Sequence, residues 1–135
     1  MAVPINKLKG MSVGLEAKLK ERGIYNSDQL LAAARTPAGR DDLAGYAGVG
    51  TRVILELANR ADLARVKGIA GVFSDLLEHA GVDTVKELAT RRADNLYAKL
   101  IETNRQERLA GRAPTMNAVE QWVAQAKGLP RLLEY

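Results

Sequence analysis

The sequence predicts an all-α fold, and three observations support that prediction. Hydrophobic residues make up 47% of the chain but aromatic residues only 4%, so the core has to be built from aliphatic side chains. Its Ala-rich and Leu-rich composition favours helices over strands. No stretch alternates apolar and polar residues as a half-buried strand would. Finally, the segment from Ile5 to Leu30 is echoed by the segment from Ala64 to Leu88, so an internal repeat organises the fold.

The two copies of the repeat align without gaps. Gly10 matches Gly68 and Gly23 matches Gly81, and both pairs lie 58 positions apart. The same offset pairs Lys9 with Lys67, Leu19 with Leu77 and Leu30 with Leu88. Because glycines and apolar positions coincide, we expect both copies to adopt one local structure.

Each copy predicts two helices joined through glycine. A turn with an apolar-flanked glycine comes first, and a helix of about ten residues follows it. Gly23 or Gly81 then ends that helix, since glycine suits a left-handed C-terminal cap. Ser27 in the first copy, and Asp83 or Thr84 in the second, is the predicted N-cap of the next helix.

A further glycine turn, Gly48-Val49-Gly50, lies between the copies. It is predicted to open a helix from Thr51 to about Arg60. The helix before it is predicted to start near Pro37, because proline fits the first helical turn.

Two more helices are predicted after the second copy. The segment "ADNLYAKLIETN" reads as a helix with Leu96, Leu100 and Ile101 turned inward, and "RQERLAGRAPT" reads as a loop. The segment "MNAVEQWVAQAK" is a closing amphipathic helix, with Trp122 as a packing anchor. Its apolar face consists of Met116, Val119, Val123 and Ala126.

The glycine turns resemble the helix-hairpin-helix signature, in which an apolar-Gly-apolar-Gly turn joins two helices. Gly48-Val49-Gly50 fits best, "KGIAG" fits well, and "KGMSVG" has Ser12 in place of the second glycine. The resemblance implies two tandem helix-hairpin-helix units, residues 1–62 and residues 63–135 with the C-terminal helix, packed as one compact domain. The pattern "LKGMSVGLEAKLKERGIYNSDQLL" also resembles the C-terminal domain of the bacterial RNA polymerase alpha subunit.

Longer phrases resemble an uncharacterised bacterial family of tandem helix-hairpin-helix proteins, a domain of unknown function. They are "NRADLARVKGIAG", "DLLEHAGVDTVKELATRRADNLYAKL" and "VEQWVAQAKGLPRLLEY". They occur in order and span nearly the whole chain. The resemblance implies the fold and leaves the activity open.

The glycine turns also carry the functional prediction. A helix N-terminus offers unpaired N–H groups, and glycine lets a phosphate approach them closely. The resemblance implies more: in DNA-binding helix-hairpin-helix proteins the turn contacts sugar-phosphate, and such contacts position DNA without reading its bases. We therefore predict a protein that binds nucleic acid without sequence preference, with amide donors also expected from Gly68 to Val72. The predicted nucleic-acid-binding residues are Lys9, Gly10, Gly48, Val49, Gly50, Arg52, Lys67 and Gly68.

The alternative is an adaptor that binds a protein partner through the same fold, because such turns also serve only to pack helices. Asp75, Glu78 and Glu87 follow the second copy's turn, and their charge would repel phosphate there. A continuous positive surface would favour nucleic acid. An exposed apolar patch, or a basic side interrupted by acids, would favour a protein.

Composition and motifs narrow the functions and cellular locations that the sequence allows. The net charge of +4 is mildly basic, and residues 1–60 hold most of the excess. The chain has no cysteine, no apolar run of membrane-spanning length and no signal-peptide core, so a cytoplasmic protein is expected. No motif predicts a catalytic residue, a metal site or a cofactor. His79 reads as a surface residue, and Asp41, Asp42 and Asp62 read as helix-start charges. We therefore expect no enzymatic activity.

Overall fold

The computed structural model describes residues 2–69 and 71–135, and this part of the chain contains helices and no strand. The all-α prediction is confirmed. A short 3-10 helix, η1, precedes the α-helices, and Pro4 and Asn26 form an isolated bridge. The elements are η1 (Ile5–Lys7), α1 (Val13–Glu21), α2 (Ser27–Ala33), α3 (Pro37–Ala47), α4 (Thr51–Leu63), α5 (Val72–His79), α6 (Val85–Ala89), α7 (Ala93–Glu107) and α8 (Met116–Gly128).

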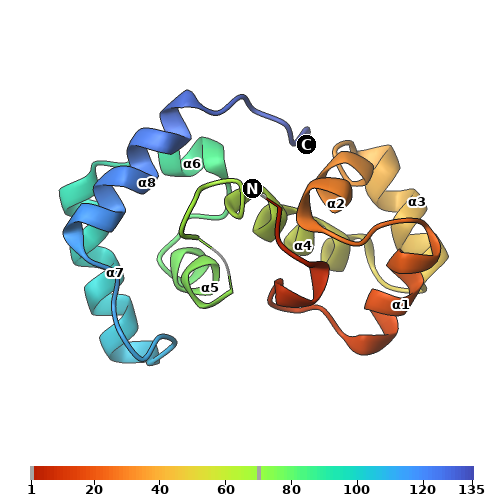
Figure 1. The fold of residues 1–135 in the computed structure, drawn as a ribbon, viewed down its shortest axis with the longest axis horizontal. Coiled ribbons are helices and arrows are strands. Elements are labelled where there is room, and N and C mark those ends of the chain that lie inside the picture. The colour runs from red at the N-terminus through yellow and green to blue at the C-terminus, as the bar shows by residue number, and fades with distance from the viewer. Residues whose placement is uncertain (1, 70) are drawn as a thin grey trace.

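Helix α4 occupies the centre of the molecule (Figure 1). It packs against α2 and α3 on one side and against α5 on the other. Helices α1 to α3 form one group, while α5 to α8 form the other, in which α8 lies across α6 and α7. One helix therefore links the two groups.

Buried side chains gather into two clusters that meet along α4. The first cluster runs from Ile5 to Ala61 and takes in one distant residue, Leu133. The second cluster runs from Leu63 to Ala126. Trp122 belongs to it, only 3% exposed and with its ring centroid 5.4 Å from that of Phe73. The prediction that Trp122 is a packing anchor is confirmed.

The repeat is visible in the backbone. Gly10 and Gly68 have φ angles of 93° and 95°, and Gly23 and Gly81 have φ angles of 78° and 93°. Gly23 and Gly81 each follow the C-cap of a helix, α1 and α5 respectively. The predicted helix ends are therefore confirmed.

Matching hydrogen bonds accompany these glycines. The amide of Ile24 donates to the carbonyl of Leu19 at 3.0 Å, and the amide of Val82 donates to that of Leu77 at 2.8 Å. Both bonds span five residues across the end of a helix, as in a Schellman cap. The two copies of the repeat thus end their first helix in the same way.

The start of α2 corrects one expectation. Its N-cap is Asn26, whose side chain accepts from the amide of Gln29, and the predicted cap Ser27 is wrong. Ser27 is buried inside the first helical turn because its hydroxyl oxygen accepts from the amide of Val3 at 2.9 Å. In the second copy Thr84 is the N-cap, one of the two predicted residues.

The other predicted helices are present. Helix α3 begins at Pro37 as predicted, and α4 begins at Thr51 but continues beyond the predicted end to Leu63. In α7, Leu96 and Leu100 are buried and Ile101 is half-buried. The predicted loop starts later than expected, because α7 extends to Glu107.

A segment that the repeat does not predict follows α8. Residues 129–135 leave the second group of helices and cross to the first, as the blue trace shows (Figure 1). Leu133 is 2% exposed within the first cluster, and the amide of Glu134 donates to the carbonyl of Arg35 at 2.9 Å. We call residues 129–135 the crossing segment. It joins the two groups a second time, independently of α4.

Candidate functional site

The Gly10 turn, residues 8–12, leads into α1. Gly10 is exposed, and a Cβ on it would lie 3.7 Å from Leu57 of α4. Ser12 caps α1 by accepting from the amide of Leu15. The preceding amides, of Val13 and Gly14, donate to no acceptor within residues 2–69 and 71–135. Val13 is 85% exposed, so the start of α1 is open to solvent.

The Gly48 turn, residues 48–50, leads into α4. Gly48 has a left-handed conformation with φ 72° and ends α3, while Gly50 is the N-cap of α4 and has no side chain to cap it. Both glycines are exposed, and a Cβ on either would meet nothing within 4 Å. Val49 is half-buried against the first cluster. The start of α4 is therefore a second open helix N-terminus.

Charged side chains flank the Gly48 turn. Arg52 is 89% exposed, and its Nε lies 3.2 Å from a carboxylate oxygen of Glu56. The hydroxyl of Thr51 donates to Asp41 at 3.0 Å. A cation and two carboxylates thus surround the start of α4, so its positive potential is partly balanced.

Helices α1 and α3 pack against each other within the first group (Figure 1). Arg22, just after α1, pairs with Asp42 in the middle of α3 at 2.8 Å. Tyr46, nearer the end of α3, donates to Glu21 at 2.5 Å, and Lys18 lies over its ring. The hydrogen bond to Glu21 raises the pKa of the Tyr46 phenol above its ordinary value. The second half of α1 therefore lies against the second half of α3.

The Gly68 turn, residues 66–71, has partners inside the chain. The amide of Lys67 donates to the side chain of Gln125 in α8 at 2.9 Å. A Cβ on Gly68 would lie 3.1 Å from the indole nitrogen of Trp122, also in α8. Ala70 of the predicted donor range lies outside the described residues. Helix α8 thus binds the amide of Lys67, which directly precedes the predicted donors, and packs against Gly68.

Acidic side chains beyond the Gly68 turn are neutralised internally. Arg60 of α4 is 11% exposed and contacts both Asp75 at 3.0 Å and Glu78 at 2.6 Å. Its Nε and Nη1 atoms are buried without a hydrogen-bond partner in the described part of the chain. These acids therefore serve the contact between α4 and α5.

The eight predicted site residues lie in three turns. The Gly10 turn supplies Lys9 and Gly10, and the Gly48 turn supplies Gly48, Val49, Gly50 and Arg52. Lys67 and Gly68 lie in the turn that α8 contacts, although both residues are exposed. The periodicity of α8 showed which of its residues face inward, but it did not show that they contact this turn.

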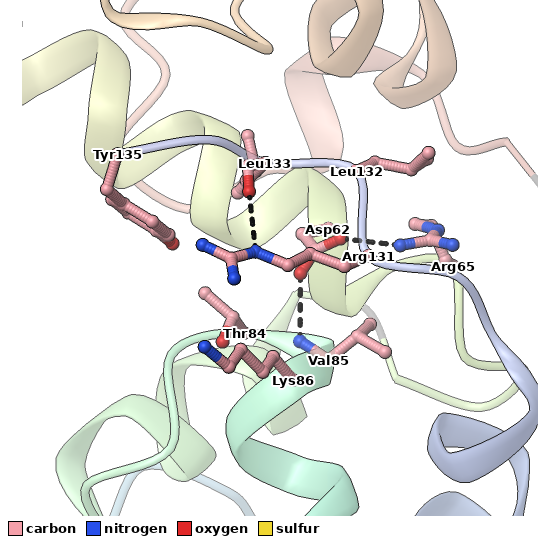
Figure 2. A pocket seen from close by; sticks show the side chains of 9 residues that line it. All are labelled: Asp62, Arg65, Thr84, Val85, Lys86, Arg131, Leu132, Leu133 and Tyr135. Carbon is pink, nitrogen blue, oxygen red and sulfur yellow. Dashed lines mark hydrogen bonds and ion pairs between the residues drawn. The ribbon is translucent and has the colours of Figure 1, made fainter.

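A buried carboxylate organises the place where α4, α6 and the crossing segment meet (Figure 2). Asp62 is 3% exposed, accepts from the amide of Val85 at 2.8 Å and pairs with Arg65 at 2.8 Å. Asp62 lies in the last turn of α4, so the prediction that it is a helix-start charge is wrong. It instead holds the start of α6, a role that depends on a contact between distant segments.

The hollow beside Asp62 is too small for a ligand. Its volume of about 10 Å³ is close to the minimum needed for one water molecule. Arg131 reaches across it, and its Nε donates to the carbonyl of Leu133 at 3.2 Å (Figure 2). We assign this cluster a structural role.

Residues 2–69 and 71–135 contain neither a candidate metal site nor a helix that could span a membrane. No group of three or more His, Cys, Asp or Glu side chains is arranged to hold a metal ion there. In the same residues, every helix is too short or too polar to cross a membrane.

Comparison with known proteins gives a single assignment. The family described as "Domain of unknown function (DUF4332)" matches residues 9–129. The chain belongs to this family. The DUF4332 match confirms the resemblance to an uncharacterised domain over nearly the whole chain, and it carries no statement about helix-hairpin-helix units or bacterial origin. No curated protein and no solved structure matches the chain significantly.

Proposed function

We propose that this DUF4332 protein binds the phosphate backbone of nucleic acid without sequence preference, through the Gly10 and Gly48 turns. The observation that carries the proposal is that α1 and α4 both begin in solvent-open turns that contain exposed glycines. Each start presents unpaired amides and the positive end of a helix dipole. Such starts bind phosphate oxygens without reading bases.

The proposal includes a fold assignment. The chain consists of two tandem helix-hairpin-helix units, residues 1–62 and 63–135, closed by α8. The shared φ angles of Gly10 and Gly68 and the matching caps after Leu19 and Leu77 support this division. The Gly68 turn of the second unit contributes little to the binding proposed here, because α8 contacts that turn.

Two cations supply charge beside the amides. Lys9 is exposed next to Gly10, and Arg52 is exposed in the first turn of α4. Arg52 can exchange Glu56 for a phosphate at little cost, because an exposed ion pair is worth only about 0–1 kcal/mol. Asp41 opposes binding, because its carboxylate accepts from Thr51 at the same helix start.

Fluorescence anisotropy with two unrelated DNA duplexes at several salt concentrations tests the proposal. We expect similar affinities for both duplexes and a steep loss with salt. Arg52→Ala should weaken both duplexes alike and reduce the salt slope by about one unit. Lys86→Ala, which removes an exposed charge from α6, is the matched control and should change the slope less. Asp41→Asn should strengthen binding.

A protein-binding adaptor is the second candidate, and the exposure of Val13 favours it. An apolar side chain that is 85% exposed beside the Gly10 turn would gain from burial against a partner. Absence of binding to either duplex at low salt, with the protein folded by circular dichroism, would overturn the nucleic-acid proposal. The adaptor would then be the better account.

A further inference from the structure

A basic hollow lies beside the connection between α6 and α7. Its volume is about 390 Å³, within the range of small-ligand pockets. The polar side chains that line it are Thr90, Arg91, Arg92, Asn95 and Lys99, and none of the lining residues is acidic. Neither glycine-turn binding nor the packing of the two clusters accounts for three cations around one hollow.

Two of these cations have no acidic partner in the structure. Arg91 and Lys99 form no ion pair within residues 2–69 and 71–135. Arg92 differs, since its guanidinium contacts both carboxylate oxygens of Asp94, at 3.3 and 3.0 Å. Unpaired like charges repel one another, so an anion placed between Arg91 and Lys99 would relieve that repulsion.

The hollow is partly organised in advance. Arg91 is half-buried, and its Nη2 donates to the carbonyl of Gly81 at 2.9 Å. This bond holds the guanidinium in place and leaves its other N–H groups available. Asn95 and Lys99 lie four residues apart on α7 and so share one helix face. An entering anion would therefore meet a guanidinium, an amide and an ammonium group with little reordering.

From this arrangement we infer that the hollow is a binding site for a phosphate group. Phosphate suits it because several oxygens can accept at once from a guanidinium fork and from neighbouring donors. Asn95 adds a neutral donor through its side-chain amide. The site uses none of the residues of the Gly10 and Gly48 turns, so it stands independently of the proposed function.

The neighbouring hollow is less suited to an anion. It shares Thr90, Arg91 and Arg92 with the basic hollow but is larger. It is also lined by the carboxylates of Asp94 and Glu120 and by Lys127. The bond from Arg92 lowers the pKa of Asp94, so this carboxylate is charged at neutral pH. We therefore place the phosphate on the side of Arg91 and Lys99.

Isothermal titration calorimetry of the full chain with inorganic pyrophosphate is the direct test. We expect saturable binding that weakens about tenfold in Lys99→Gln and more in the Arg91→Gln/Lys99→Gln double variant. Lys86→Gln removes one exposed charge from α6, outside the hollow, and should bind as the wild type does. Circular dichroism of each variant checks that the fold is kept. No binding by the wild type, or equal binding by wild type and Lys99→Gln, would overturn the inference.

Two further experiments identify the source of the phosphate group and distinguish this site from the glycine turns of the proposed function. If a single-stranded oligonucleotide competes with pyrophosphate in the wild type but not in Lys99→Gln, a nucleic-acid backbone is the source of the phosphate. If the oligonucleotide does not compete, the source is a small phosphorylated molecule. Lys9→Ala/Arg52→Ala removes the cations of the glycine turns and should leave pyrophosphate binding unchanged. Loss of pyrophosphate binding in that variant would also overturn the inference.

Discussion

The guanidinium of Arg40 in α3 donates a hydrogen bond of 2.7 Å to the main-chain carbonyl of Glu134, which lies 94 residues further along the chain. The same side chain also donates to the carbonyl of Ala34 at 2.9 Å, and it is only 4% exposed. A buried arginine is stable only where acceptors satisfy its donors. Arg40 therefore fixes the crossing segment to the end of α2.

Leu133→Ala tests how much this attachment contributes to stability. Leu133 is 2% exposed in the first cluster, so its truncation should lower the free energy of unfolding by about 2–5 kcal/mol. That loss is large for a domain whose total stability is typically about 5–15 kcal/mol. Urea unfolding followed by circular dichroism measures it. Arg131→Ala, at an exposed position of the same segment, should lower the free energy of unfolding much less. Equal losses in the two variants would contradict the packing of Leu133.

Gly68→Ala and Gly10→Ala form a matched pair. Both glycines have nearly the same positive φ, so the backbone strain introduced by alanine should be similar, about 1–2 kcal/mol. A Cβ at Gly68 also lies 3.1 Å from the Trp122 indole, whereas at Gly10 it lies 3.7 Å from Leu57. We therefore expect Gly68→Ala to lower the melting temperature more. A larger effect at Gly10 would show that α8 does not crowd the Gly68 turn.

Asp62→Ala should be strongly destabilising. It removes the acceptor of the Val85 amide and leaves the nearly buried Arg65 without its carboxylate. Breaking a buried ion pair in this way costs about 3–5 kcal/mol. Asp42→Ala breaks the exposed pair with Arg22 and should cost about 0–1 kcal/mol. Chemical denaturation of both variants gives the comparison, and similar losses would argue against a buried role for Asp62.

Tyr46 should titrate above its ordinary pKa of 10.0, because its hydroxyl donates to the Glu21 carboxylate. A raised folded-state pKa means that this contribution to stability is complete below pH 10 and is lost as the pH rises through the higher value. An ultraviolet difference titration of the wild type against Tyr46→Phe isolates this phenol. Glu21→Gln should lower the titration midpoint of Tyr46. An unchanged midpoint would show that the hydrogen bond to Glu21 does not raise the pKa of Tyr46.

The parts of the fold that local sequence controls could be predicted. Gly23 and Gly81 end helices because a left-handed residue is needed there, and Pro37 starts one because its fixed φ suits the first turn. The N-cap at Asn26 was missed because Ser27 has equal local chemistry. Only the contact from Val3, in a segment far away in the sequence, decides between them.

The crossing segment could not be predicted for the same reason. The sequence "LPRLLEY" is too short to show a helical period, and its partners Arg35 and Arg40 are remote. In the candidate site, the glycine turns were identified from their residue types. Helix α8 contacts the Gly68 turn through Trp122 and Gln125, whereas the Gly10 and Gly48 turns stay open. This difference depends on tertiary packing, so the sequence could not show it.

The position of Leu133 has a consequence for the order of assembly during synthesis. A ribosome releases the chain from its N-terminus, and units of a protein commonly begin to fold as they emerge. The first cluster, however, takes one of its buried side chains from residue 133. Helices α1 to α4 can collapse early, but their core is complete only when α8 and the residues after it have left the exit tunnel. The helices made before Leu133 thus reach their final packing only after it has been made.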